Sequence, residues 1–250
     1  MANELLYMPG IGTRFYYSAA AGSASLDVVG SDSWTSALED GHGALSLSGG
    51  TAFNFSIPGM SGSHTIEYWI KLTGWANTGT SHQWGYIGSH NLSYELWRPK
   101  AVSGTNNINM QLDFETPDPE DTTVSLSSQN DFIHVAEVFD TSDSNYQLKM
   151  YVNGTKVKQH YFNMTWANAL VIGGHIDTYG ATAPADGFTG KISDVLVTSG
   201  AKYTDTFTPA RPSLDLSGFT KGGNPIKNFT APEINYLEIG GVPYKIAVAS

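Results

Sequence analysis

Aromatic and histidine side chains gather in two stretches of this sequence that carry no clear strand pattern. The first, residues 73–91, is rich in Gly, Thr, Ser, His and aromatic residues, and the second follows the apolar run at residues 170–174. Sugars stack on exposed aromatic rings, while a few polar groups fix their orientation. The candidate glycan-binding residues are Trp75, His82, Trp84, Tyr86, His175, Asp177 and Tyr179. The alternative is that these aromatic residues, together with His90, cover the ends of the fold or pack against a neighbouring subunit.

A second set of candidate residues lies on a hairpin centred on Asn153-Gly154. This dipeptide favours a type I′ turn, which requires positive φ at both central positions. The turn predicts that Val152 pairs with Thr155 and Met150 with Val157, so that one face of both strands is largely apolar. The opposite face carries three lysines, Lys149, Lys156 and Lys158. The predicted register places Lys149 directly opposite Lys158. Such a face is either solvated or an assembly surface for the acidic side of another subunit.

The elements that would hold these residues are short strands separated by turns. Strand patterns are predicted at residues 4–8, 14–18, 25–29, 86–87, 92–97, 108–115, 132–140 and 188–198. Residues 44–58 alternate Leu45/Leu47 and Phe53/Phe55 around Gly49-Gly50, which predicts a second hairpin. Residues 64–72 alternate apolar and polar side chains, which predicts a half-buried strand. Many short strands and no convincing amphipathic helix predict an all-β, two-sheet antiparallel sandwich.

Composition shifts divide the chain into three parts. Residues 1–40 are predicted to be an N-terminal arm or the first strands, residues 41–212 the sandwich, and residues 213–250 a docking tail. The tail begins with a Gly-rich link and contains two short strand patterns, at residues 236–239 and 244–248. Tyr236 and Tyr244, which begin these two patterns, are candidate assembly residues.

Charge and composition exclude several classes of partner. The 250 residues carry a formal net charge of −10, which disfavours nonspecific binding to nucleic acid or to anionic membranes. There is no cysteine, so disulfides and thiolate metal sites are excluded. The first residues lack the pattern of a signal peptide, and no apolar run approaches the ~20 residues that span a bilayer. We therefore expect synthesis in a cytoplasm and no membrane insertion.

The motifs also resemble a known family. The order ALSLSG, HTIEYWI, FIHVAEVFD, LKMYVNGTKV, LVIGG and FTGKISDVLV, between residues 44 and 212, is similar to the laminin-G-like branch of the concanavalin A-like lectin/glucanase superfamily. The match includes His134-Val135-Ala136 and the full Tyr-Val-Asn-Gly motif at residues 151–154. Ser193 replaces the first Asp of the last motif, and Asp194 keeps the second. Glu137 stands where the family has an apolar residue, which predicts a polar contact or an exposed sheet edge.

The resemblance implies a concanavalin A-like jelly roll and suggests where such a protein works. Residues 201–209, AKYTDTFTP, are similar to the ending of these domains in tailed-phage structural proteins. Some relatives bind calcium through loop carboxylates, for which the candidates here are Asp118, Glu120 and Asp121, or Asp177 with Asp186. Because solvated acids are the simpler explanation, no metal or other cofactor is assigned.

A catalytic role is disfavoured. Glu233 and Glu238 resemble the carboxylate pair of family 16 glycoside hydrolases, but Asn235 replaces the middle Asp of that signature, and the segment follows the sandwich. Residues five apart on a plain strand also lie on opposite faces, whereas retaining hydrolysis needs two carboxyls close together. His134 is expected to be a packed, hydrogen-bonded histidine.

The sequence therefore predicts a non-enzymatic protein on the virion surface of a tailed phage. Capsid decoration is the first hypothesis, with residues 1–40 and 213–250 as anchors and the sandwich facing outward. The alternatives are a receptor-binding tail or fibre component that recognises host-surface glycans, and a carbohydrate-active enzyme or its binding module. The expected partners are other virion proteins, further copies of the chain and a glycan.

Overall fold

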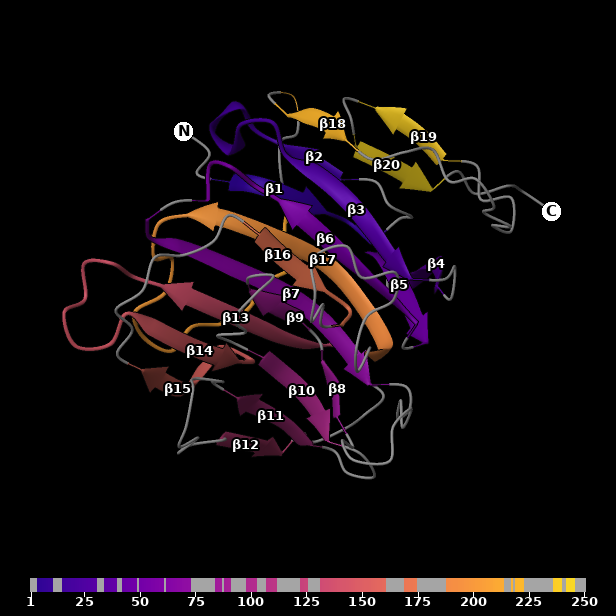
Figure 1. The fold of residues 1–250 in the computed structure, drawn as a ribbon. Coiled ribbons are helices and arrows are strands. Elements are labelled where there is room, and N and C mark those ends of the chain that lie inside the picture. The colour runs from indigo at the N-terminus through magenta and orange to yellow at the C-terminus, as the bar shows by residue number, and fades with distance from the viewer. Residues whose placement is uncertain are drawn as a thin grey trace.

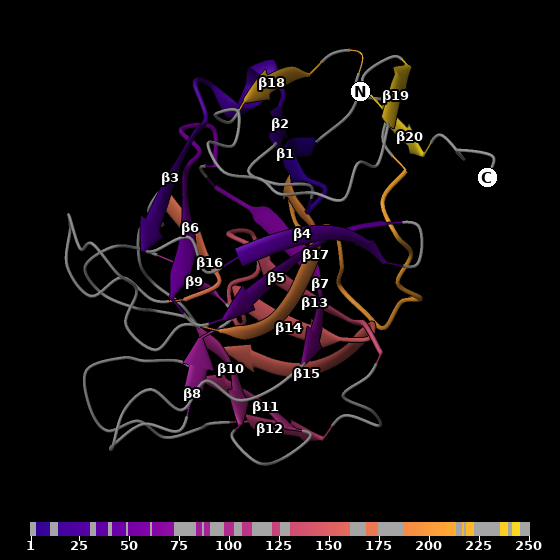
Figure 2. The same ribbon diagram turned by 90° about the vertical axis from the view of Figure 1, so that its right-hand side faces the viewer.

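A computed structural model shows two β-sheets packed face to face and a third sheet beside them (Figures 1 and 2). The structure describes residues 4–10, 15–30, 34–39, 42–48, 50–60, 62–72, 84–86, 88–90, 98–102, 107–111, 122–125, 131–160, 169–174, 188–213, 217, 219–222, 236–239 and 242–245. Within this part of the chain every pair of neighbouring strands is antiparallel. The all-β sandwich that the sequence predicts is confirmed.

The main sheet has ten strands. Its path is β15-β14-β13-β7-β17-β1-β2-β18, and β5 pairs with both β17 and β4. The bounds are β1 Glu4–Met8, β2 Phe15–Tyr17, β4 Trp34–Glu39, β5 His42–Ser48, β7 His64–Leu72, β13 Ile133–Phe139, β14 Leu148–Val152, β15 Thr155–His160, β17 Thr189–Ser199 and β18 Thr220–Gly222.

Two smaller sheets complete the arrangement. The facing sheet covers one side of the main sheet and has the order β3 (Ser25–Gly30), β6 (Thr51–Ser56), β16 (Ala169–Ile172) and β9 (Gly88–His90). The side sheet has the order β12 (Thr122–Ser125), β11 (Asn107–Gln111), β10 (Arg98–Val102) and β8 (Trp84–Tyr86). A pair formed by β19 (Tyr236–Ile239) and β20 (Val242–Lys245), and a short 3-10 helix at Ala19–Ala21, lie outside these sheets.

The core lies between the main and facing sheets because alternate residues of each strand point inward. On β7, Ile66, Tyr68 and Ile70 are at most 1% exposed, and Phe53 and Phe55 of β6 are fully buried opposite them. No helical segment among the described residues has the length and hydropathy needed to cross a bilayer.

The prediction of a hairpin at residues 44–58 is wrong. β5 pairs with β17 and β4 in the main sheet, whereas β6 pairs with β3 and β16 in the facing sheet. The chain therefore changes sheets between Ser48 and Thr51. Alternation predicted the inward side chains correctly, since Leu45, Leu47, Phe53 and Phe55 all join one core cluster. It did not distinguish strands that pair in one sheet from strands that face each other across the core.

The hairpin at Asn153-Gly154 is confirmed, but its predicted register is wrong beyond the first pairs. Asn153 and Gly154 have φ of 47° and 76°, as a type I′ turn requires. Val152 pairs with Thr155, but a bulge then shifts the ladder, so Met150 pairs with Lys158 rather than Val157. Lys149 is consequently opposite Gln159, not Lys158. An extra residue on one strand is a common device at twisted sheet edges, and the alternation of side chains does not reveal it.

Strand β7 is also more buried than expected. It lies between β13 and β17, and its second face carries Thr65 and Glu67, which are 0% and 5% exposed. Residues 201–211, called the strap below, cover this second face. Figure 2 shows this orange segment on the side of the main sheet that is turned away from the facing sheet.

The N-terminal residues contribute strands to the sandwich. The predicted strands at 4–8, 14–18 and 25–29 correspond to β1, β2 and β3. β1 lies between β17 and β2, and Leu5, Leu6 and Met8 are buried. β18, from the predicted docking tail, extends the same sheet by pairing with β2. The predicted strand at residues 92–97 lies outside the described residues.

Candidate functional site

Several strands end or begin together at one end of the sandwich, which we call the loop end. Leu72, the last residue of β7, pairs with Gly190, and Ser48, the last residue of β5, pairs with Thr189. Ile172, the last residue of β16, pairs with Phe53 near the start of β6. In Figure 1 the ends of β5 and β7 and the start of β17 lie at the lower right.

Both sequence stretches with candidate glycan-binding residues connect to this end. Gly88 of β9 pairs with Ile172, so the chain passes from Tyr86 into the facing sheet beside the end of β16. The stretch that begins with His175 leaves from Gly174, and it returns where the Phe188 N–H donates to the Gly173 carbonyl at 2.9 Å. The described ends of the two stretches, far apart in sequence, thus lie close together in the backbone.

The structure describes only part of the predicted set. Trp84 and Tyr86 both lie on β8, at the edge of the side sheet, and strand periodicity places them on the same face. A short strand was expected at residues 86–87 and is found at Trp84–Tyr86. The remaining candidates lie outside the described residues: Trp75, His82, His175, Asp177 and Tyr179. His90 ends β9 and pairs with Leu170.

The strap covers the second face of the main sheet, and the buried carboxylate of Glu67 is one of its two polar anchors. Tyr203 donates to Oε2 of Glu67 at 2.7 Å, Lys202 binds Oε1, and Nε2 of His134 lies 3.4 Å from Oε2. Burial would raise the pKa of Glu67, but the hydrogen bonds from His134, Lys202 and Tyr203 outweigh it, so the pKa lies below its ordinary value. His134 is 2% exposed, as the packed histidine predicted from the sequence.

A second buried carboxylate fixes the other end of the strap. Asp194 sits at a bulge of β17 with a φ of 50°, and its side chain is 1% exposed. It accepts hydrogen bonds from Tyr7 and Arg211, both at 2.6 Å. The Arg211 guanidinium also lies 4.4 Å from the ring centroid of Trp69 and 4.6 Å from that of Phe132, which are cation–π distances. Burial, followed by the charge of Asp194, raises the pKa of Tyr7.

Aromatic packing holds the middle of the strap. The rings of Tyr203 and Phe207 are stacked with centroids 3.5 Å apart, and Phe207 contacts His134 edge-on. The Phe207 N–H donates to the Gly154 carbonyl at 3.0 Å. Burial, followed by the charge of Asp205, raises the pKa of Tyr151 under this layer to about 12. This face of the sheet is therefore filled from within the chain.

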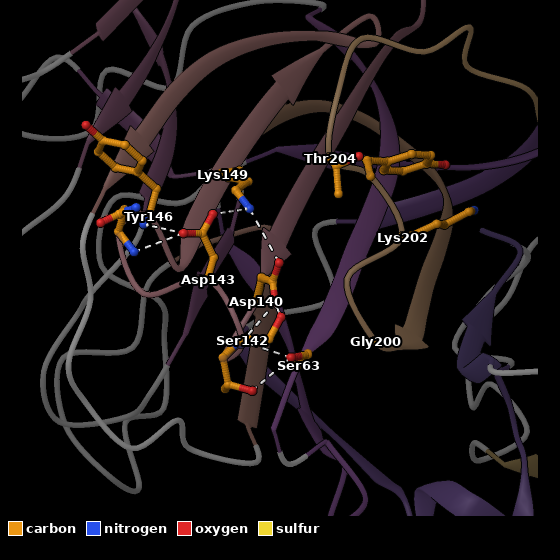
Figure 3. A network of polar contacts seen from close by, with 12 residues as sticks. Ser63, Asp140, Ser142, Asp143, Tyr146, Lys149, Gly200, Lys202 and Thr204 are labelled. Carbon is orange, nitrogen blue, oxygen red and sulfur yellow. Dashed lines mark hydrogen bonds and ion pairs between the residues drawn. The ribbon is translucent and has the colours of Figure 1, made fainter.

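The predicted assembly lysines are in different environments. Lys149 is 5% exposed and binds Asp143 at 2.8 Å and Asp140 at 3.4 Å (Figure 3). It is therefore not part of a solvated face. Lys158 is 7% exposed, whereas Lys156 is exposed. Hydrogen bonds from Lys149, Tyr146 and Asn145 hold the pKa of Asp143 well below its usual range.

The tail residues are placed only by their backbone. Tyr236 pairs with Lys245, and Tyr244 pairs with Leu237. The two tyrosines therefore occupy opposite faces of the β19–β20 pair. Glu238 lies in β19, outside the three sheets, while its proposed catalytic partner Glu233 is not among the described residues.

The described residues hold no cluster of three or more His, Cys, Asp or Glu side chains arranged for a metal ion. The calcium candidates Asp118, Glu120, Asp121 and Asp186 lie outside this part of the chain. Glu137, in the core, accepts a hydrogen bond from Tyr68 at 2.6 Å, which is the polar contact that the sequence analysis gave as one alternative. Burial, followed by the charge of Glu137, raises the pKa of Tyr68.

Comparison with known proteins identifies the family. Residues 47–205, well over half of the chain, match a laminin-G-type family model described as the concanavalin A-like lectin/glucanases superfamily. The chain belongs to this superfamily. Its fold is lectin-like. No curated protein sequence matches the chain.

Several solved structures share the fold at low identity. A botulinum neurotoxin type C structure, from work on cell entry through two ganglioside molecules, has a TM-score of 0.55 and 13% identity, and covers 80% of this chain and 49% of that chain. The receptor-binding domain of botulinum neurotoxin type G has a TM-score of 0.53 and 16% identity, and covers 81% and 49%. This chain thus spans about half the length of these structures, and the likeness concerns the fold alone.

The sequence analysis did not identify the strap or its anchors. Glu67, Asp194 and Arg211 form the polar contacts that close the second face, and none was predicted to do so. Two signals were present. Asp194 retains a family acid, and the Tyr and Phe of residues 201–209 are the two rings that stack in the strap.

Proposed function

We propose that the chain is a non-enzymatic, lectin-like protein that recognises a glycan at its loop end. The observation that carries this proposal is the pairing of Gly88 with Ile172, because it places β9, which follows Trp84 and Tyr86 in the chain, beside the end of β16, after which the second aromatic-rich stretch begins. Trp84 and Tyr86 occupy the same face of an edge strand, and aromatic residues in such a position can stack on sugars. Membership of a superfamily that contains lectins supports the proposal.

The absence of catalysis is part of the same proposal. The buried carboxylates Glu67, Asp194 and Glu137 are each bound to side chains of the fold, so they are occupied by structural contacts. Glu238 belongs to the separate β19–β20 pair, away from the loop end where a glycan would bind. Binding without hydrolysis is the expected outcome with any glycan that the protein recognises.

The proposal is tested with the purified chain on a broad glycan array, with and without a calcium chelator. We expect binding to a defined set of glycans, lost in Trp84→Ala. The matched control is Tyr146→Ala, because Tyr146 is an aromatic residue, 44% exposed, in the turn at the opposite end of the sandwich. A folded protein that binds nothing, or equal losses in both variants, would exclude the proposal. Sensitivity to the chelator would add a metal to the site.

We further propose that this protein is displayed on the virion surface of a tailed phage. The support is the similarity of residues 201–209 to the ending of such domains in phage structural proteins. Capsid decoration is a second role, favoured by one observation: the β19–β20 pair lies outside the three sheets and is available as an anchor. A receptor-binding role in a tail or fibre follows instead if glycan recognition is the main activity.

A further inference from the structure

The side sheet has one face toward the core and one face away from it. Ile108 is fully buried within the core cluster, and Val124, its partner on β12, packs against that cluster. Their neighbours Thr123 and Ser125 are exposed. Because directly paired residues of antiparallel strands share a face, these four residues assign every position of the sheet to the inner or the outer face.

The outer face collects aromatic and polar residues, with Val102 as the one aliphatic position. Lys100 pairs with Tyr86 on one side and with Asn109 on the other, and Asn109 pairs with Thr123. The same register adds the remaining alternate positions. We call the following set of register positions the outer platform: Trp84, Tyr86, Arg98, Lys100, Val102, Asn107, Asn109, Gln111, Thr123 and Ser125. Both views place the side sheet at the lower margin of the molecule, with no coloured strand beyond it (Figures 1 and 2).

This set contains the groups that bind a sugar chain. Aromatic residues at the β8 edge can stack on sugar rings, and amide and hydroxyl side chains on β11 and β12 can hydrogen-bond to sugar hydroxyls. The four strands span about 14 Å across their axes, which suits an oligosaccharide rather than a single sugar.

The charge of the platform is opposite to that of the whole chain. Arg98 and Lys100 are the charged residues of the four strands, which contain no Asp or Glu. A chain with a net charge of −10 thus presents two cations and no carboxylate on this sheet. Arginine and lysine form their strongest hydrogen bonds with carboxylates, sulfates and phosphates. A neutral glycan would leave these cations unused.

We propose that the outer platform of the side sheet binds an extended acidic glycan, one that carries carboxylate or sulfate groups. The inference rests on the proposed function, since it extends the same site from Trp84 and Tyr86 across the sheet. Lys100 supplies the central anion contact because it lies at the register position next to Tyr86. Arg98 pairs with Gln111 and has no partner on β8, so it lies farther from the aromatic edge of the sheet.

The test is an array on which neutral oligosaccharides are printed beside their sialylated, sulfated and uronate-containing counterparts. We expect the protein to bind the acidic members at least about tenfold more tightly than the neutral ones. This preference should weaken as salt is added. Lys100→Gln should lower the affinity for acidic members about tenfold and leave that for neutral members unchanged. Lys156→Gln, at an exposed lysine of β15, is the matched control and should change neither.

The outcomes separate this inference from the proposed function. Equal binding of neutral and acidic members, or an unaltered preference in Lys100→Gln, overturns the acidic class while glycan binding stands. No binding by folded protein overturns both. Lys100-dependent binding of RNA or DNA, tested in parallel, overturns the inference in favour of a nucleic acid. Thermal unfolding of each variant establishes that the fold is intact.

Discussion

At the residue scale, Gly154 combines two requirements that no other residue type meets. Its φ of 76° completes the type I′ turn, and a Cβ there would lie 1.9 Å from the Phe207 carbonyl oxygen. Asn153 completes the turn from the other side, because its Oδ1 accepts the His134 N–H at 3.0 Å and its own N–H donates to the His134 carbonyl. The turn is thus both the end of the hairpin and the docking point of the strap.

Gly154→Ala should therefore lower the free energy of unfolding by more than the unfavourable turn geometry alone would. We expect a loss of about 2–4 kcal/mol in the free energy of unfolding, from the left-handed backbone and from displacement of Phe207. Gly200→Ala is the control, because Gly200 has a φ of 88° but nothing within 4 Å of its Cβ position. The Gly200→Ala variant should lose only about 1–2 kcal/mol of its free energy of unfolding. Urea unfolding measures both, and equal losses would mean that the strap does not press on the turn.

At the scale of the element, the strap is a third layer held by polar anchors at its two ends and by aromatic packing in its middle. Its contacts with Glu67 and Asp194 place cations from residues 201–211 on carboxylates of the main sheet. Removing the cation from such a buried carboxylate is costly, because the carboxylate then lacks its counter-charge. The cost should be smaller at Glu67, since the Lys202 side chain is 39% exposed. The strap should consequently respond to the protonation state of the sheet beneath it.

Acid should weaken the strap through Glu67. Because the folded pKa of Glu67 is lowered, its contribution is present above the unfolded value of about 4.3 and is lost as pH falls through the folded pKa. Glu67→Gln should cost about 2 kcal/mol at pH 7, and its deficit relative to wild type should shrink below about pH 4. Tyr203→Phe, which removes one donor, should cost less. A deficit that stays constant with pH would show that the charge of Glu67 does not hold the strap.

The elements themselves were largely predictable, and their partners were not. Alternation or a high apolar content located β7, β13, β14 and β17, although β13 and β17 also carry buried polar residues such as His134 and Asp194. It failed between β5 and β6 because inward side chains look alike whether two strands pair or face each other. The bulge opposite Met150 depends on the twist of the sheet edge, which residue types do not encode. Burial of Glu67 depends on a segment more than 130 residues away in sequence.

At the scale of the whole molecule, the candidate site is a product of topology. The sequence identified Trp84, Tyr86 and the stretch after Gly174 as similar in chemistry, but it did not predict the pairing of β9 with β16, which places the strand after Tyr86 beside the end of β16. The outer platform required the register of four strands, none of which has a distinctive sequence pattern. Local propensity identifies which residues can bind a sugar, whereas long-range pairing determines which of them act together.

Deleting the first residues and deleting the last residues of the chain should have opposite outcomes for folding. Deleting residues 1–10 removes β1, which lies between β17 and β2 and buries Leu5, Leu6 and Met8. Full burial of such side chains contributes roughly 1.5–3 kcal/mol each, and the lost ladder removes one neighbour from each of β17 and β2. We expect this variant to be unfolded. A thermal unfolding transition like that of the full chain would mean that the first strands are dispensable for folding, as an external anchor arm would be.

Deleting residues 223–250 should leave the sandwich intact, because the cut falls after β18, whose Gly222 lies against the Phe15 ring. The β19–β20 pair removed by this cut belongs to none of the three sheets. We expect thermal unfolding and glycan binding close to those of the full chain, together with loss of incorporation into phage particles. Incorporation is measured by mixing each form with particles that lack the protein and sedimenting them. A truncated chain that still incorporates would exclude the anchor and leave glycan recognition as the role to pursue.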